Sequence, residues 1–158
     1  MRVKIDTKTV LIVVLSLVVL LGVSAGLLAG RAASNKRYHE ISGDGWVAYV
    51  RKSNKVYVEL DANATTGFQW MVDEVPSFLE LTGNDYRQSK SSKGLVGAGG
   101  TTTISFKALD EGTGVVELAY RRDWVGGETA RVLELTCNVE RNSNGSLVAR
   151  SLEIAEKK

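Results

Sequence analysis

The chain of 158 residues is poor in the residue types that many catalytic and metal sites need, with one cysteine, one histidine and one proline. Cys137 alone cannot form an internal disulfide, and the metal-binding clusters built from several Cys and His side chains are excluded. The single histidine, His39, falls in a polar connector, so a paired nucleophile and histidine base is not expected. We therefore expect no enzyme activity, no metal and no cofactor.

Charge is also modest, at +2, and much of the excess lies near the two ends of the chain. Nucleic-acid binding usually needs a concentrated basic face, so we do not expect it. Carboxylate pairs such as Asp73-Glu74 and Asp110-Glu111 are sequence neighbours near turns. Adjacent strand residues point to opposite faces, which indicates solvated edges and not the paired acids of a glycosidase.

One long apolar run is present near the N-terminus. Val10 to Ala29 carries no charge, and three basic residues precede it. About 20 apolar residues are enough to cross a bilayer, and basic residues on the N-terminal side favour an inside N-terminus. We expect residues 1–30 to be a hydrophobic helix, serving as a membrane anchor or as a signal peptide cleaved after Val23-Ser24-Ala25. Either form places the rest of the chain outside the cytoplasm.

Beyond a polar connector at 31–45, the sequence alternates with the period of two that is typical of β-strands. The predicted strands are Trp46 to Arg51, Lys55 to Asp61, Phe68 to Val72, Thr102 to Ala108, Val115 to Tyr120 and Val132 to Val139, with Phe78 to Leu81 ambiguous. Turn residues separate them. The pattern predicts an all-β, immunoglobulin-like sandwich over 46–141. A C-terminal extension, 142–158, would add a strand or trail along the sheet.

Three of the predicted turns hold residues suited to binding, and each has a plainer explanation. Asn63-Ala64-Thr65-Thr66-Gly67-Phe68 puts two hydroxyls at an exposed tip, or is an ordinary turn. Ser89 to Gly100 is rich in glycine, and is a flexible loop or backbone that pairs with an extended partner. The β-prone run after it excludes a phosphate-binding loop. Arg122-Asp123-Trp124 is a binding hot spot, or a tryptophan that closes the core.

Together and in this order, the three loops resemble those of the chagasin family, inhibitors of papain-like cysteine peptidases. That family carries Asn-Pro-Thr-Thr-Gly-Phe/Tyr-x-Trp, Gly-x-Gly-Gly and Arg-Pro-Trp/Phe. This chain has Asn63-Ala64-Thr65-Thr66-Gly67-Phe68-Gln69-Trp70, Gly97-Ala98-Gly99-Gly100 and Arg122-Asp123-Trp124. Ala64 and Asp123 stand where the family has proline, so a fixed φ is missing from both loops. The resemblance covers about Val47 to Val139.

The resemblance implies that the three loops gather at one end of the sandwich and enter the cleft of a papain-like cysteine peptidase, reversibly and competitively. The peptidase-binding residues it implies are Asn63, Thr65, Thr66, Gly67, Phe68, Gly97, Gly99, Gly100, Arg122 and Trp124. The first loop would cover the catalytic Cys/His pair, the second would follow the substrate groove, and Trp124 would stack on an aromatic surface. The alternative is a surface immunoglobulin-like adhesion or receptor module that binds another protein or a glycan.

Overall fold

The computed structural model describes residues 36–52, 54–89 and 99–157. Residues from Arg37 onward form one compact unit. Within the described ranges the elements are β1 (Tyr38–Gly43), β2 (Trp46–Arg51), β3 (Lys55–Ala62), the 3-10 helix η1 (Ala64–Thr66), β4 (Phe68–Glu74), β5 (Leu79–Gln88), β6 (Gly100–Ala108), β7 (Gly112–Arg122), β8 (Thr129–Arg141) and β9 (Leu147–Glu156).

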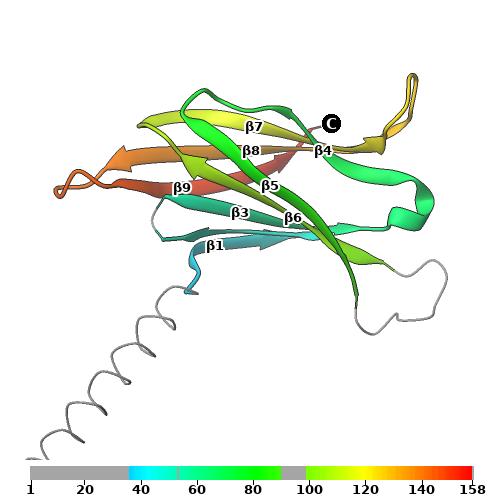
Figure 1. The fold of residues 1–158 in the computed structure, drawn as a ribbon, viewed down its shortest axis with the longest axis horizontal. Helices are drawn as coiled ribbons and strands as arrows, with labels where there is room; N and C mark the ends of the chain where they lie inside the picture. Colours follow the sequence, from blue (N-terminus) through cyan, green and yellow to red (C-terminus); the bar gives the residue numbers. More distant parts are fainter. Residues whose placement is uncertain (1–35, 53, 90–98, 158) are drawn as a thin grey trace, which may run out of the picture. The chain divides into compact units, whose positions relative to one another are not determined.

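The strands form two antiparallel sheets that pack face to face over one core (Figure 1). The first sheet has the order β1-β2-β3-β6-β5 and the second the order β4-β7-β8-β9. Alternation along each strand builds the core: Val56, Val58 and Leu60 of β3 are fully buried, and so are Leu133 and Leu135 of β8. The predicted all-β class with two packed sheets is confirmed.

Three edge strands were not predicted, or were left open, from the sequence. Residues 31–45 were expected to be a connector, but Tyr38–Gly43 form β1 and pair with β2. Leu147–Glu156, within the expected C-terminal extension, form β9 and pair with β8. The ambiguous run at Phe78 to Leu81 opens β5, which continues to Gln88. All three strands lie at sheet edges, where one neighbour is missing and fewer side chains are buried, so period-two alternation is weak.

The predicted signal or anchor, residues 1–30, lies outside the described residues. In the part of the chain that the structure does describe, no helix has the length and apolar character needed to cross a membrane.

The lone cysteine belongs to the core. Cys137 of β8 is fully buried and packs in the same cluster as Leu135 and Val139. Burial raises the pKa of its thiol to about 11, because an apolar environment disfavours the thiolate. A buried, protonated thiol is a packing residue and a poor nucleophile.

We therefore expect Cys137 to be inert to a thiol reagent such as iodoacetamide in the folded protein at neutral pH. Mass spectrometry after timed labelling measures this. Denaturation in guanidinium is the control, since it exposes the thiol and gives one label per chain. Rapid labelling of the native protein would contradict the burial described here.

Candidate functional site

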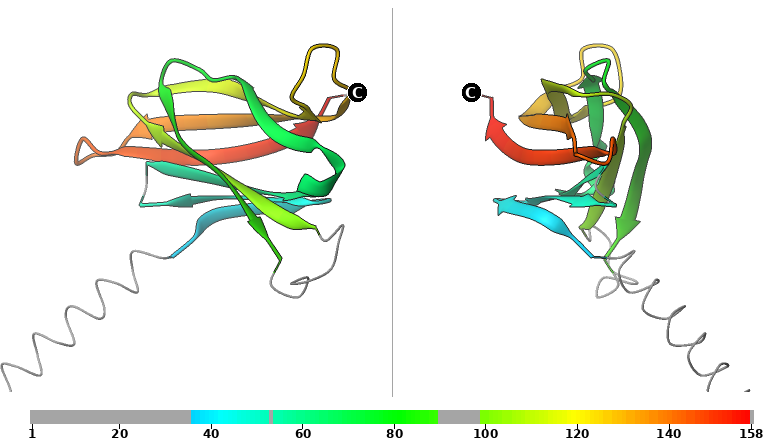
Figure 2. Two further views of the ribbon diagram at one scale, coloured as in Figure 1. Left: turned by 45° about the vertical axis from the view of Figure 1, so that its right-hand side comes forward. Right: turned by 90° about the vertical axis from the view of Figure 1, so that its left-hand side faces the viewer.

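The strand ends that bound the three predicted loops lie at one end of the sandwich (Figures 1 and 2). The loops join β3 to β4, β5 to β6 and β7 to β8. Strand register explains the grouping. Ala62, which ends β3, pairs with Gly100, which begins β6. Phe68, which begins β4, pairs with Arg122, which ends β7. Described residues of all three loops are thus brought together.

Asn63 organises the first loop. Its side-chain Oδ1 accepts hydrogen bonds from the Thr65 backbone N–H at 3.2 Å and from the Thr65 hydroxyl at 2.7 Å. Its carbonyl oxygen accepts from the Thr66 backbone N–H at 3.1 Å and from the Thr66 hydroxyl at 2.7 Å. Asn63 therefore caps η1, as asparagine often does at helix starts. Each threonine hydroxyl donates its only proton inside the loop, so toward a partner it can only accept.

Gly67 ends η1 and joins the first loop to the third. Its φ of 76° lies in the left-handed region, which glycine enters without the steric penalty of a side chain. A Cβ on Gly67 would lie 3.6 Å from the indole carbons Cη2 and Cζ3 of Trp124. The Trp124 ring therefore rests against the backbone of the first loop, and the two loops form one surface.

A stack of rings links these loops to the core. The Arg122 guanidinium carbon lies 4.7 Å from the Phe68 ring centre and 5.5 Å from the Trp124 ring centre. Beneath it, Phe68 contacts the Tyr120 ring, with centroids 5.4 Å apart, and Tyr120 contacts Trp70 at 5.1 Å. Trp70 is buried, so the stack runs from the interior to the surface.

The described part of the second loop is its base. Gly99 is exposed, and its carbonyl oxygen accepts a hydrogen bond from the Ser89 backbone N–H at 3.2 Å. Gly100 pairs with residues of β3 on one side and β5 on the other. A Cβ there would collide with the Arg87 carbonyl oxygen, so only glycine fits. Gly97 lies outside the described residues.

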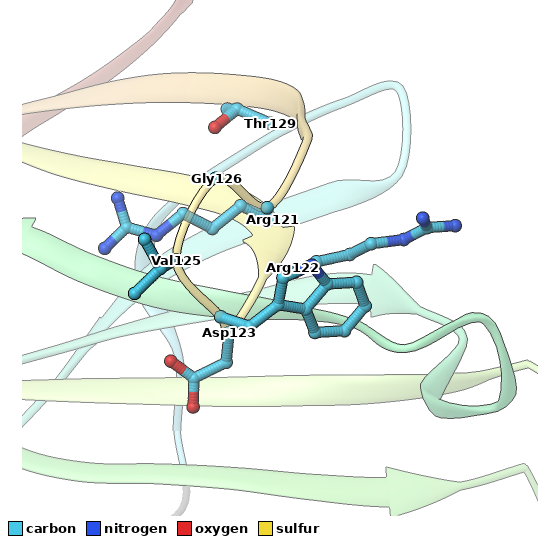
Figure 3. A pocket seen from close by; sticks show the side chains of 8 residues that line it. Arg121, Arg122, Asp123, Val125, Gly126 and Thr129 are labelled. Atoms are coloured by element: carbon cyan, nitrogen blue, oxygen red, sulfur yellow. The ribbon is translucent and has the colours of Figure 1, made fainter.

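The third loop projects its apolar side chains into solvent. Trp124 is 58% exposed and Val125 is fully exposed. The loop encloses a hollow of about 480 Å³ lined by its own residues (Figure 3). Figure 3 shows the Arg121 and Arg122 side chains pointing in opposite directions, with the Asp123 carboxylate directed away from both. Arg121 forms a two-point ion pair with Asp73 of β4, at 2.7 and 2.9 Å, which fixes the base of the loop.

The described residues at this end form a surface suited to binding. Among the described residues, no group of three or more His, Cys, Asp or Glu side chains is placed to hold a metal ion. What the end offers is a projecting edge with hydrogen-bond acceptors, exposed glycine backbone and a half-exposed indole. Such an edge can bind a concave partner.

The sequence profile of the chagasin family peptidase inhibitors (I42) matches residues 49–139, a span that includes all three loops. The chain belongs to the chagasin family. Members of this family are peptidase inhibitors and not enzymes, and membership implies a cysteine peptidase as the target. The expectation that the chain is not an enzyme is thereby confirmed, as is its resemblance to the family.

Among named chagasin-family relatives, Amoebiasin-1 of Entamoeba histolytica is 29% identical over 91 residues, which cover 58% of this chain and 87% of that protein. Chagasin of Trypanosoma cruzi is 36% identical over 87 residues, covering 52% of this chain and 78% of that protein. Amoebiasin-2 of Entamoeba histolytica is 24% identical over 80 residues, covering 51% and 65%. No solved structure matches the chain significantly.

Tyr120, which was not predicted as a site residue, positions the first loop at this end. Its hydroxyl accepts a hydrogen bond from the Asn63 backbone N–H at 2.9 Å, while its ring carries Phe68. The available signal was a tyrosine on the same face of its strand as Leu118 and Val116. A half-buried tyrosine usually needs a partner for its hydroxyl, and the nearest loop supplies one.

Replacing Asn63 tests the cap. Asn63→Ala removes the side-chain acceptor, so we expect faster hydrogen exchange at the Thr65 amide and an unfolding free energy lower by about 1 kcal/mol. Asn63→Asp is the matched variant, because its carboxylate can accept the same two hydrogen bonds. NMR exchange and denaturant titration measure both effects. If the Asp variant behaves like the Ala variant, the side-chain acceptor does not hold the loop.

Proposed function

We propose that this chagasin-family domain is a reversible, competitive inhibitor of papain-like cysteine peptidases that occludes the active-site cleft with its three loops. The observation that carries the proposal is the contact between the first and third loops, in which the exposed Trp124 indole lies on the Gly67 backbone. This contact makes one continuous edge of two segments far apart in the sequence. A rigid scaffold that presents loops is a common way to bind a partner.

The first loop would sit over the catalytic Cys/His pair. Because the Thr65 and Thr66 hydroxyl protons are already donated to Asn63, these oxygens would face the peptidase as acceptors. A catalytic histidine in its charged form is a donor of the matching kind. Hydrogen bonds with an ionised donor are the stronger ones, worth about 1.5–3 kcal/mol.

The same loop conformation supports inhibition without cleavage. A peptidase acts on a peptide bond held in an extended conformation, whereas Ala64–Thr66 form a turn of 3-10 helix closed by the Gly67 N–H to Ala64 carbonyl hydrogen bond at 3.3 Å. To become a cleavable peptide bond in an extended segment, this part of the loop would first have to lose its 3-10 turn. Binding would rest on hydrogen bonds and apolar contact, with no covalent bond formed, and would therefore be reversible.

The other two loops would extend the contact on either side. Gly99 presents exposed backbone without a side chain of its own, suited to lying along a substrate groove, and Gly100 holds the base of the loop in the sheet. Trp124 would supply apolar area with few rotors to immobilise. Tight interfaces of standard size bury roughly 1,600 Å² in total, which three loops can supply.

We further propose an immunoglobulin-like arrangement of the two sheets, and an extracytoplasmic domain. The first is supported by the crossings of the chain between sheets at β3–β4, β4–β5 and β6–β7, as in Greek-key sandwiches. The second is supported by the apolar run at Val10 to Ala29 with its basic N-terminal flank, read as a signal peptide or as an anchor with the N-terminus inside.

Trp124→Ala tests the inhibitor. A buried tryptophan hot spot contributes about 2 kcal/mol or more, so we expect the inhibition constant against a papain-like peptidase to rise roughly 30-fold. Leu109→Ala is the matched control, because Leu109 is 52% exposed but lies in the β6–β7 turn at the opposite end. Steady-state assays over a small panel of these peptidases measure competition. Absence of inhibition by the unaltered protein throughout the panel would reject the proposal.

A further inference from the structure

The outer face of the five-stranded sheet carries a hollow of about 280 Å³ that the peptidase-binding end does not use. Its lining includes Arg51, Tyr57, Thr103, Ser105, Asp85 and Arg87. The hollow exists because small residues meet at its centre. Gly83 of β5 pairs with Ser105 of β6, and a Cβ on Gly83 would lie 2.9 Å from the Ser105 hydroxyl oxygen. Larger side chains on neighbouring strands form its walls.

One wall is fixed by internal contacts. Tyr49 is only 1% exposed although it points to the outer face, and its ring stacks on Tyr57 with centroids 5.4 Å apart and planes 11° from parallel. Its hydroxyl donates to Glu59 Oε1 at 2.7 Å, and Arg37 donates to both Glu59 oxygens at 2.8 and 3.0 Å. Burial and the Glu59 contact raise the pKa of Tyr49 to about 12. The Glu59 carboxylate therefore already has its hydrogen-bond partners within this wall.

Other lining groups remain uncommitted. In the described part of the chain, Arg51, Arg87 and Asp85 form no ion pair, although all three line the same hollow. The Arg51 guanidinium lies over the Tyr49 and Tyr57 rings, at 5.2 and 5.1 Å, with its Nε buried and without a hydrogen-bond partner. Since Glu59 is paired with Arg37, the lining of the hollow holds two guanidinium groups without an ion pair against the single carboxylate of Asp85.

The two arginines lie at opposite ends of the hollow. Arg51 pairs in register with Lys55, and Arg87 pairs with Thr101, which faces Asp61. Lys55 and Asp61 both belong to β3, so the two rows are separated by about 20 Å at roughly 3.3 Å per residue. The two side chains nevertheless line one hollow, so they reach it from opposite ends, and a ligand with more than one negative group can pair with both.

We propose that this hollow binds an oligosaccharide that carries carboxylate or sulfate groups. The arginines would pair with its anionic groups, Asp85 and Thr103 would hydrogen-bond its hydroxyls, and one sugar unit would lie beside Tyr57. Binding pockets combine an aromatic wall with a few placed polar groups in this way. An acidic peptide would bind differently, by adding a strand to the free edge of β5, and is therefore the comparison that the test must separate from a sugar bound over the face of the sheet.

Isothermal titration of the full chain with a sulfated oligosaccharide and with a uronate oligosaccharide tests the proposal. A neutral oligosaccharide and a glutamate peptide of similar length serve as comparison probes. We expect either or both anionic sugars to bind, more weakly as salt rises because screening shortens the range of the attraction. Equal binding of the neutral sugar or of the peptide would overturn the proposal, as would no binding of either anionic sugar.

Two variants and a control place the site. The double variant Arg51→Gln, Arg87→Gln should weaken sugar binding about tenfold or more, since both charge-assisted contacts are lost. Ser105→Leu, which fills the hollow, should do the same if its melting curve shows it folded. Arg150→Gln is the matched control, because Arg150 pairs with Glu140 on the other sheet. If Arg150→Gln weakens sugar binding as much as the double variant does, the site is refuted.

Peptidase inhibition should be unchanged in the double variant. Failure of sugar binding and failure of inhibition are thus separate outcomes.

Discussion

A stack of side chains from the core to the surface holds the first and third loops in shape. Trp70 is anchored inside, Tyr120 lies on Trp70, Phe68 lies against Tyr120, and Arg122 bridges Phe68 to Trp124. Aromatic contacts of this kind contribute about 0.5–1.5 kcal/mol each beyond their buried area. The exposed indole is therefore positioned by the interior, and not by its own loop alone.

The same stack couples the loops to strand register. Phe68 and Trp70 are two positions apart on β4, so they lie on the same face. They pair with Arg122 and Tyr120 of β7. A slip of one residue would turn all these side chains to the opposite face. The Arg121–Asp73 ion pair lies on that other face of the same two strands. Both faces therefore favour one register, and the register sets how the first and third loops meet.

Strand alternation made much of the fold predictable, and loop chemistry made the candidate site predictable in outline. Internal strands such as β3 bury every second side chain, so the alternation of Val56, Val58 and Leu60 with polar residues predicts the strand. Edge strands do not, because their exposed faces tolerate polar residues. Contacts between loops also escaped prediction. Nothing local to Gly67 indicates that Trp124, far away in the sequence, would lie on it, since that contact depends on how β4 pairs with β7.

The absence of proline from both motifs is offset in different ways. In the first loop, Asn63 restrains the backbone around Ala64 with side-chain and main-chain hydrogen bonds. In the third, the Gly127 N–H donates to the Trp124 carbonyl oxygen at 2.8 Å and the Arg122 N–H to the Glu128 carbonyl oxygen at 3.1 Å. Restraint before binding lowers the entropy lost on binding.

Asp123 adds what proline lacks, an exposed charge beside the indole. Charges at the rim of an interface act mainly on association rate and on the choice of partner. If the proposed binding mode holds, Asp123 would bear more on the choice of peptidase than on the shape of the loops.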